Sequence, residues 1–235
     1  EQYQQNEIWK LDALNILACG SYSTGEQEQG DSYTRLYKRL LDQQADTLAA
    51  TDQIATMRGI FLAREDWSHA THEYTQLVQN SEPFPKPTTL STLTELIVMT
   101  GEQPENQPEL CERASKLAKE SGARHAYAIA RRASGRMNLD RQNWEQAELD
   151  LKEALAESES LDLVWDQGQA HYCLGLLYRR RAEMLFKDQT TERTAEISRA
   201  RFQFEQAIGF FESLKAVRDA QRVRRAIAQD SKAPV

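Results

Sequence analysis

The 235 residues of the chain can bury a sizeable hydrophobic core, and length alone allows one large domain or two ordinary ones. A formal net charge of −7 repels phosphate backbones, which argues against nucleic acid as a partner. No apolar run reaches the length of a membrane span and no signal peptide is visible, so the sequence argues against a membrane protein and favours the cytoplasm.

The cysteines favour the same compartment. Cys19, Cys111 and Cys173 lie far apart in apolar helical patterns, without the close spacings of a disulfide framework. We therefore expect buried, reduced thiols, as in a cytosolic protein. The sequence also begins at Glu1 rather than Met, inside a helical pattern, and we expect it to be part of a longer protein.

The composition predicts an all-α fold. Ala, Leu, Glu, Gln and Arg dominate, and the alternating runs of Val, Ile and Thr that are typical of strands are missing. Apolar residues recur at helical spacing in a series of segments, which we interpret as about five antiparallel pairs plus a terminal helix. The predicted helices span 2–20, 31–45, 47–65, 67–80, 88–100, 107–121, 124–141, 143–157, 163–186, 193–213 and 215–229.

A glycine-rich segment near the N-terminus has the spacing of a phosphate-binding loop. The residues from Gly25 to Ser32 read Gly-Glu-Gln-Glu-Gln-Gly-Asp-Ser, with Asp31 where the phosphate-binding lysine is required. A carboxylate at that position would repel phosphate. We therefore interpret 21–31 as a solvated loop with Asp31 as the N-cap of the next helix.

Two of the predicted pairs share an order of small and large residues. The first contains Gly135, Trp144, Ala147, Leu151 and Ala154, and the second contains Leu174, Gly175, Tyr178, Ala200, Phe204 and Ala207. This order resembles the tetratricopeptide repeat (TPR), in which a small residue of the first helix packs against a small residue of the second and aromatic residues fill the gap.

The TPR resemblance implies one helical-repeat domain over 1–235, wound as a right-handed superhelix of antiparallel helix pairs. The N-terminal pair matches poorly, the middle repeats are degenerate, and the later repeats are clear before a capping helix. The corresponding ranges are 1–45, 47–121, 124–213 and 215–229.

The second clear repeat departs from the usual spacing. Gly135 and Ala147 are 12 residues apart, whereas Gly175 and Ala200 are 25 apart. We therefore expect helices 163–186 and 193–213 to be longer than standard by about two turns. Their extra length predicts an elongated hairpin near 182–198.

The C-terminal part also resembles the repeat arrays of bacterial multidomain signalling ATPases and transcriptional regulators. The residues that carry this resemblance are Ala200, Phe204, Phe210 and Phe211 with the Arg-rich last helix. In that family the array senses a ligand or partner and controls an ATPase or output domain. The resemblance implies a context in signal transduction.

Chemistry-bearing side chains do not form a recognisable catalytic or metal-binding pattern. His69 and His72 lie three residues apart next to Glu73, but no third ligand is apparent, and we interpret them as a surface pair. His125 and His171 have no identifiable serine or cysteine partner, so no catalytic triad can be argued. We expect neither enzymatic activity nor a cofactor.

The strongest functional signal is positive charge on the first helices of the last two repeats, which line the concave face in TPR proteins. Guanidinium groups there could bind a carboxylate or phosphate bidentately, or they could pair with acids of the chain itself. The resemblance directs six residues into this groove: Arg132, Arg136, Tyr172, Leu176, Arg179 and Arg180.

The sequence therefore predicts a scaffold or adaptor that binds a protein or peptide, with an acidic segment as the expected partner. The alternative is a ligand-sensing domain that controls an attached output domain. A Walker A motif upstream in the parent chain would favour this alternative.

Overall fold

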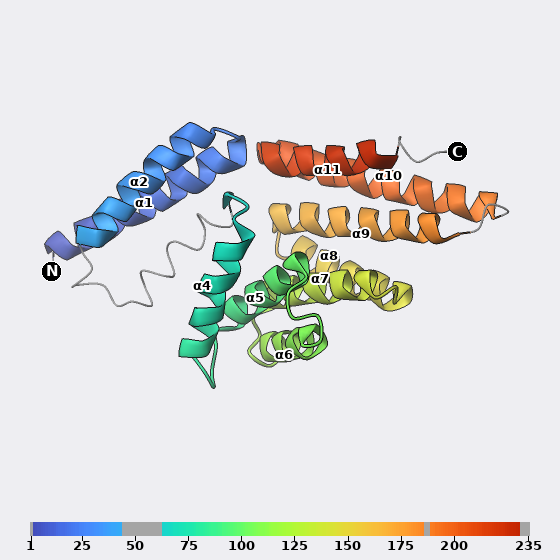
Figure 1. The fold of residues 1–235 in the computed structure, drawn as a ribbon, viewed down its shortest axis with the longest axis horizontal. Coiled ribbons are helices and arrows are strands. Elements are labelled where there is room, and N and C mark those ends of the chain that lie inside the picture. Colours follow the sequence, from blue (N-terminus) through green and yellow to red (C-terminus); the bar gives the residue numbers. More distant parts are fainter. Residues whose placement is uncertain (1, 44–62, 186–188, 231–235) are drawn as a thin grey trace. The chain divides into compact units, whose positions relative to one another are not determined.

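The computed structural model describes residues 2–43, 63–185 and 189–230, which form helices joined by turns and contain no strand (Figure 1). The predicted all-α fold is thus confirmed for this part of the chain. The chain divides into two compact units, 1–85 and 86–235, described separately below. None of the described helices combines the length and the apolar character that a membrane span requires.

In the first unit, α1 (Gln2–Thr24) and α2 (Gln27–Gln43) pack together as a hairpin. The chain reverses at Gly25, whose φ of 88° lies in the left-handed region that glycine adopts without strain. The predicted loop over 21–31 is wrong, because α1 continues to Thr24 and α2 begins at Gln27. Asp31 therefore lies inside α2 and is not its N-cap.

The hairpin is closed by Tyr22, which is fully buried. Its ring lies directly over Gly30, where an added Cβ would come within 2.6 Å of the Tyr22 Cε1 atom. The Tyr22 hydroxyl donates a hydrogen bond to Asp31 at 2.7 Å and lies 3.0 Å from the Thr34 hydroxyl. Gly30 is therefore a packing glycine within α2 rather than a turn residue.

The helix predicted at 47–65 lies almost entirely outside the described residues. The next described helix, α4 (Trp67–Asn80), has the predicted bounds. Its N-cap is Asp66, whose carboxylate accepts a hydrogen bond from the His69 amide at 3.4 Å and also contacts the His69 ring at 2.8 Å.

In the second unit, the described residues form three helix pairs and a last helix (Figure 1). The first helices of the pairs stack side by side, since α7 packs against both α5 and α9. Each second helix also packs against the first helix of the next pair. The pairs are α5 (Pro87–Thr100) with α6 (Gln107–Glu120), α7 (Arg124–Asp140) with α8 (Trp144–Ser160), and α9 (Val164–Met184) with α10 (Thr190–Ser213), followed by α11 (Val217–Asp230).

One type of turn recurs between these helices. After the helix, one residue takes a positive φ, and the next amide reaches back five residues to a carbonyl of the last helical turn, as in a Schellman motif. This turn closes the last turn of the helix and fixes the direction in which the next helix leaves. The left-handed residues are Gly101 (φ 72°), Gly122 (68°), Gln142 (62°), Asp162 (54°) and Lys215 (56°), and the bonds run from Glu102 to Ile97, Ala123 to Ala118, Asn143 to Asn138, Leu163 to Ser158 and Ala216 to Phe211.

Glycines bring the two helices of a pair into close contact. A Cβ on Gly135 would lie 2.6 Å from the Leu151 Cγ atom and 3.2 Å from the Ala147 carbonyl oxygen. A Cβ on Gly175 would lie 2.5 Å from the Phe204 ring. The predicted contact between small residues of the two helices is therefore present at Gly135 and Ala147, whereas Gly175 packs against the aromatic ring of Phe204.

The last pair is longer than the others. Helices α9 and α10 have 21 and 24 residues, compared with 17 each in α7 and α8. Arg181 ties the end of this pair to α8, because its guanidinium lies 2.7 Å from Glu148 on α8 and 3.5 Å from Glu196 on α10. Helix α10 is thus longer by seven residues, the expected two turns, whereas α9 is longer by four residues, about one turn. The elongated hairpin near 182–198 stays a prediction, because part of it lies outside the described residues.

Candidate functional site

The structure places the six predicted site residues on two neighbouring helices. Arg132 and Arg136 lie one turn apart on α7, and the other four lie on α9. Because α7 packs between α5 and α9, side chains of α7 that point along this stack meet residues of both neighbours. The six residues nevertheless differ in what they contact.

Arg132 is held in a buried ion cluster. Its side chain is 2% exposed, and its guanidinium binds Glu95 of α5 with two contacts, Nε–Oε1 at 2.5 Å and Nη2–Oε2 at 3.0 Å. It also donates to Asp166 of α9 at 2.6 Å and lies 5.6 Å from the centre of the Trp165 ring. Arg132 therefore pairs with acids of the chain itself.

Histidine completes this cluster on the solvent side. His125 Nε2 lies 3.2 Å from the Asp166 carboxylate, and hydrogen bonding to Asp166 raises the pKa of His125 despite partial burial. Burial opposes ionisation of Asp166, but attraction to Arg132 and the contact with His125 outweigh it and lower its pKa to about 2. With His125 protonated, two cations face two carboxylates, Glu95 and Asp166.

Arg136 does not take part in this ion cluster. It lies one turn beyond Arg132 on α7 and is half-buried. Within the described part of the chain it forms no hydrogen bond or ion pair, although its charge acts on the thiol of Cys173 on α9. Arg136 is therefore a partly desolvated cation without a counter-ion among the described residues.

Tyr172 and Leu176 belong mainly to the hydrophobic interior. Tyr172 is buried, with its ring 6.1 Å from the Phe204 ring, and Leu176 packs against the same core. On the other side, the Arg222 guanidinium of α11 lies 5.5 Å from the centre of the Tyr172 ring. The Tyr172 ring therefore lies between the hydrophobic core and the Arg222 guanidinium of α11.

Arg179 and Arg180 have contacts of their own near the end of α9. Arg179 donates to the Ala226 carbonyl of α11 at 2.8 Å and lies 6.0 Å from the Phe204 ring centre. Arg180 is exposed and lies 3.3 Å from Glu183. Arg180 and Glu183 border a hollow of about 220 Å³ beside Trp144, away from Arg132.

Sequence reasoning missed the acidic partners of Arg132. Glu95 is the only charged residue of α5, a helix of apolar and hydroxyl side chains, and a single carboxylate there signals an internal partner. Asp166 gave no comparable signal, because it lies in a helix with many polar residues. Both contacts depend on how three helix pairs stack, which the spacing of residues within one pair does not reveal.

A second buried polar cluster joins α7 to α8. Asp150 has no exposed surface, and its carboxylate accepts hydrogen bonds from Asn138 at 2.9 Å, Ser134 at 2.5 Å and Gln146 at 2.6 Å, as well as from Arg131. All of its lone pairs are directed at donors, which explains how a charge is accommodated there. The Asp150 carboxylate lies beneath the surface, whereas its donor Gln146 is exposed.

The described residues contain no group of three or more His, Cys, Asp or Glu side chains that could hold a metal ion. His69 and His72 are exposed, as expected, and the contacts of their rings with Asp66 and Gln76 lie within one helical turn.

The cysteines are free, and burial raises the pKa of Cys19 to about 11 and that of Cys111 to about 12. Neither thiol is therefore activated as a nucleophile.

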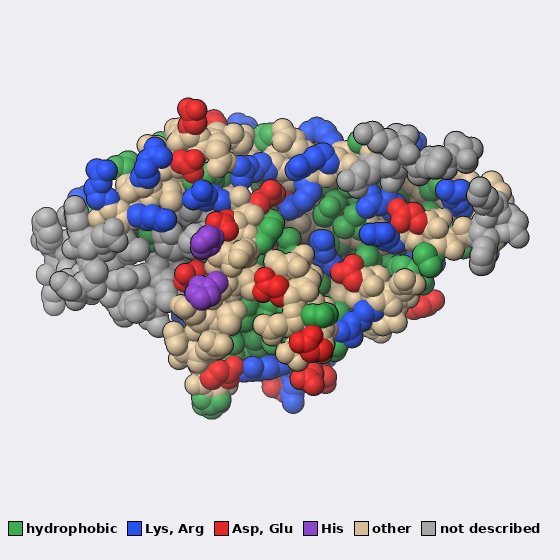
Figure 2. All heavy atoms as spheres, viewed as in Figure 1, with side chains coloured by type: hydrophobic (Ala, Val, Ile, Leu, Met, Phe, Trp, Pro, Cys, Tyr) green, Lys and Arg blue, Asp and Glu red, His purple; other side chains and the backbone are tan. Residues whose placement is uncertain are grey.

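On the face drawn in Figure 2, acidic and basic side chains are interspersed over the second unit, with hydrophobic side chains between them. In comparisons with known proteins, no family model, no curated protein and no solved structure matches this chain.

Proposed function

We propose that the chain is a binding module that recognises an acidic segment of a protein or peptide on the face formed by α5, α7 and α9. The observation that carries this proposal is Arg136, a half-buried guanidinium that has no acidic partner in the described part of the chain. A carboxylate or phosphate of a partner would stabilise a half-buried cation in this position by electrostatic attraction.

The neighbouring ion cluster supports an anionic partner rather than a cationic one. Glu95 and Asp166 are already bound by Arg132 and His125, so they offer little negative charge to a ligand. With His125 protonated the cluster is balanced, and Arg136 adds positive charge to it. Its planar guanidinium can bind a carboxylate with two parallel hydrogen bonds, which gives orientation as well as attraction.

The stacked helix pairs support a peptide-binding role. Helical repeat arrays present the first helices of successive pairs as one extended surface, and such surfaces bind segments of other proteins. The TPR-like packing at Gly135 and Gly175 agrees with this proposal. Because the chain carries a net charge of −7, attraction of an acidic partner has to be local to Arg136.

The test is recovery of a partner from cell extract with the wild-type chain and with Arg136→Glu, followed by titration of the recovered partner. We expect Arg136→Glu to weaken binding by about tenfold or more, because it replaces an attraction by a repulsion at close range. Arg132 is unsuitable for this test, since its removal would leave Glu95 and Asp166 as buried, unpaired charges.

The matched control is Arg225→Glu, the same charge change at an exposed position of α11. It should leave binding unchanged. Equal affinity of the wild-type chain and Arg136→Glu, at equal thermal stability, would refute recognition at Arg136.

A further inference from the structure

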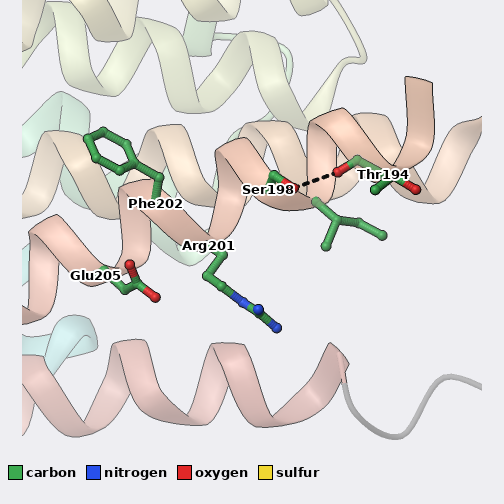
Figure 3. A pocket seen from close by; sticks show the side chains of 6 residues that line it. Thr194, Ser198, Arg201, Phe202 and Glu205 are labelled. Atoms are coloured by element: carbon green, nitrogen blue, oxygen red, sulfur yellow. Dashed lines mark hydrogen bonds between the residues drawn. The ribbon is translucent and has the colours of Figure 1, made fainter. Parts of the chain in front are cut away.

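The outer face of α10 carries exposed apolar side chains that no other described helix covers. Phe202 is 55% exposed and Ile197 is 45% exposed, whereas Phe204 and Phe211 of the same helix are buried. Together with Thr194, Ser198, Arg201 and Glu205 they border a hollow of about 340 Å³ (Figure 3). Such side chains on a helix are typical of a surface that meets another protein.

Two opposite charges accompany these apolar residues. Arg201 and Glu205 lie one turn apart on α10, and within the described part of the chain neither forms a hydrogen bond or an ion pair. Figure 3 shows their side chains on one flank of the helix and Phe202 on the other flank. The face is thus divided into a charged flank and an aromatic flank.

We propose that this face binds the same face of a second copy of the chain, with the two α10 helices antiparallel. A two-fold axis midway between Arg201 and Glu205 sets Arg201 of each copy opposite Glu205 of the other. The charged flanks then form ion pairs with each other. The same axis brings the two Phe202 rings together, so the aromatic flanks cover each other as well. Such self-complementarity is the property that a two-fold interface requires.

The middle of the face allows the two helices to approach closely. Between the flanks lie Ser198 and Gly209, which are both exposed. An added Cβ on Gly209 would meet nothing within 4 Å. In the antiparallel arrangement Ser198 of one copy falls beside Gly209 of the other, and small residues at such positions permit close helix packing. This contact is separate from Arg136 and does not depend on the proposed function.

The test is the oligomeric state of the full chain, measured by sedimentation velocity over a concentration series. We expect a concentration-dependent dimer in the wild-type chain. Arg201→Glu and Glu205→Arg should each weaken dimerisation by about tenfold or more, because each places like charges opposite one another twice. The two variants move the net charge in opposite directions, so a general charge effect would strengthen one dimer and weaken the other.

Two combinations make the test specific for a second copy. The chain with both changes should dimerise as the wild type does, because the swapped charges again face opposite charges. An equimolar mixture of the two single variants should form a heterodimer, since the acidic flank of one then meets the basic flank of the other. Arg225→Glu on α11 is the control for a charge reversal elsewhere and should dimerise normally.

Phe202→Ser tests the aromatic flank and should also weaken the dimer, and circular dichroism checks that every variant keeps its helical content. A wild-type chain that remains monomeric at the highest concentration would overturn the proposal. A dimer that neither charge reversal weakens would overturn it as well, because the two copies would then meet elsewhere.

Discussion

Gly175 shows how a single missing side chain determines the packing of a helix pair. Phe204 of α10 is almost fully buried and occupies the space that a Cβ at position 175 would need. Gly175 lies within α9, where glycine is a poor helix former and alanine would be better by about 1 kcal/mol. The close approach of α10 therefore outweighs the local helix preference.

We expect Gly175→Ala to lower the free energy of unfolding by about 1–3 kcal/mol, because the added methyl group would overpack the interior against Phe204. Urea denaturation followed by circular dichroism measures this change. Adding Phe204→Leu should recover part of the loss, since a smaller side chain makes room for the methyl group. A midpoint raised by the better helix preference of alanine would mean that Phe204 does not fill the space beside residue 175.

The TPR resemblance predicted the glycine contacts but not the pairing of the arginines. Gly135 and Gly175 could be recognised because each packs against the second helix of its own pair. Arg132, by contrast, binds Glu95, which lies 37 residues earlier on a helix that matches the repeat poorly. Whether an arginine pairs with an acidic residue of the same chain thus depends on contacts between helix pairs. Arg132 has such acidic partners, whereas Arg136 has none among the described residues.

At the scale of helices, the sequence predicted the bounds well where residues typical of turns lie between two helices. Helix α4 was predicted correctly, and α5 to α9 differ from the prediction by a few residues, because proline, glycine or polar turn residues mark their ends. The start of α2 was wrong because Gly30 has the composition of a breaker. Its role is to make room for Tyr22, a long-range contact that local patterns do not show.

The cluster that joins α5, α7 and α9 predicts a pH dependence of stability. The pKa of His125 is raised above its usual value of 6.5 in the folded chain, chiefly by Asp166. Arg132 and Glu95 are the other charged groups that act on it. Protonated His125 therefore stabilises the fold below pH 6.5, and this contribution is lost as the pH rises through the folded-state pKa.

Thermal unfolding of the wild-type chain and of His125→Gln over the neutral range measures this contribution. The difference in stability between the two chains should be largest on the acidic side and should shrink as the pH rises. A difference that does not change with pH would contradict the contact between His125 and Asp166. Titration of the other histidines is common to both chains and cancels in the comparison.

At the scale of the whole molecule, the main hydrophobic core lies entirely within one unit. Its buried residues come from α7 to α11, between Leu139 and Ala226. We therefore expect residues 86–235 to fold without residues 1–85 and to unfold in one cooperative thermal transition. A proton–nitrogen correlation spectrum of this fragment should be well dispersed, whereas a collapsed spectrum would show that its core requires the rest of the chain.

The sequence predicted the helical class of the molecule better than its organisation into units. The clear repeats at 124–213 fall inside 86–235, where stacked pairs are observed. A single repeat domain over 1–235 stays a prediction, as does the right-handed TPR superhelix. Local periodicity identifies helices, but the boundary near Pro85 depends on which helices share an interior.

Asp150 has a consequence for how such a chain avoids misfolding. Helices in a stacked array resemble one another, and apolar contacts alone would tolerate a wrong neighbour or a slip by one turn. The buried carboxylate does not, because its donors on α7 meet it only when α7 and α8 pair in one register. Any other pairing would leave the Asp150 carboxylate buried without its donors, at a high cost in free energy. Asp150 therefore favours one arrangement of two helices that apolar contacts alone would not distinguish.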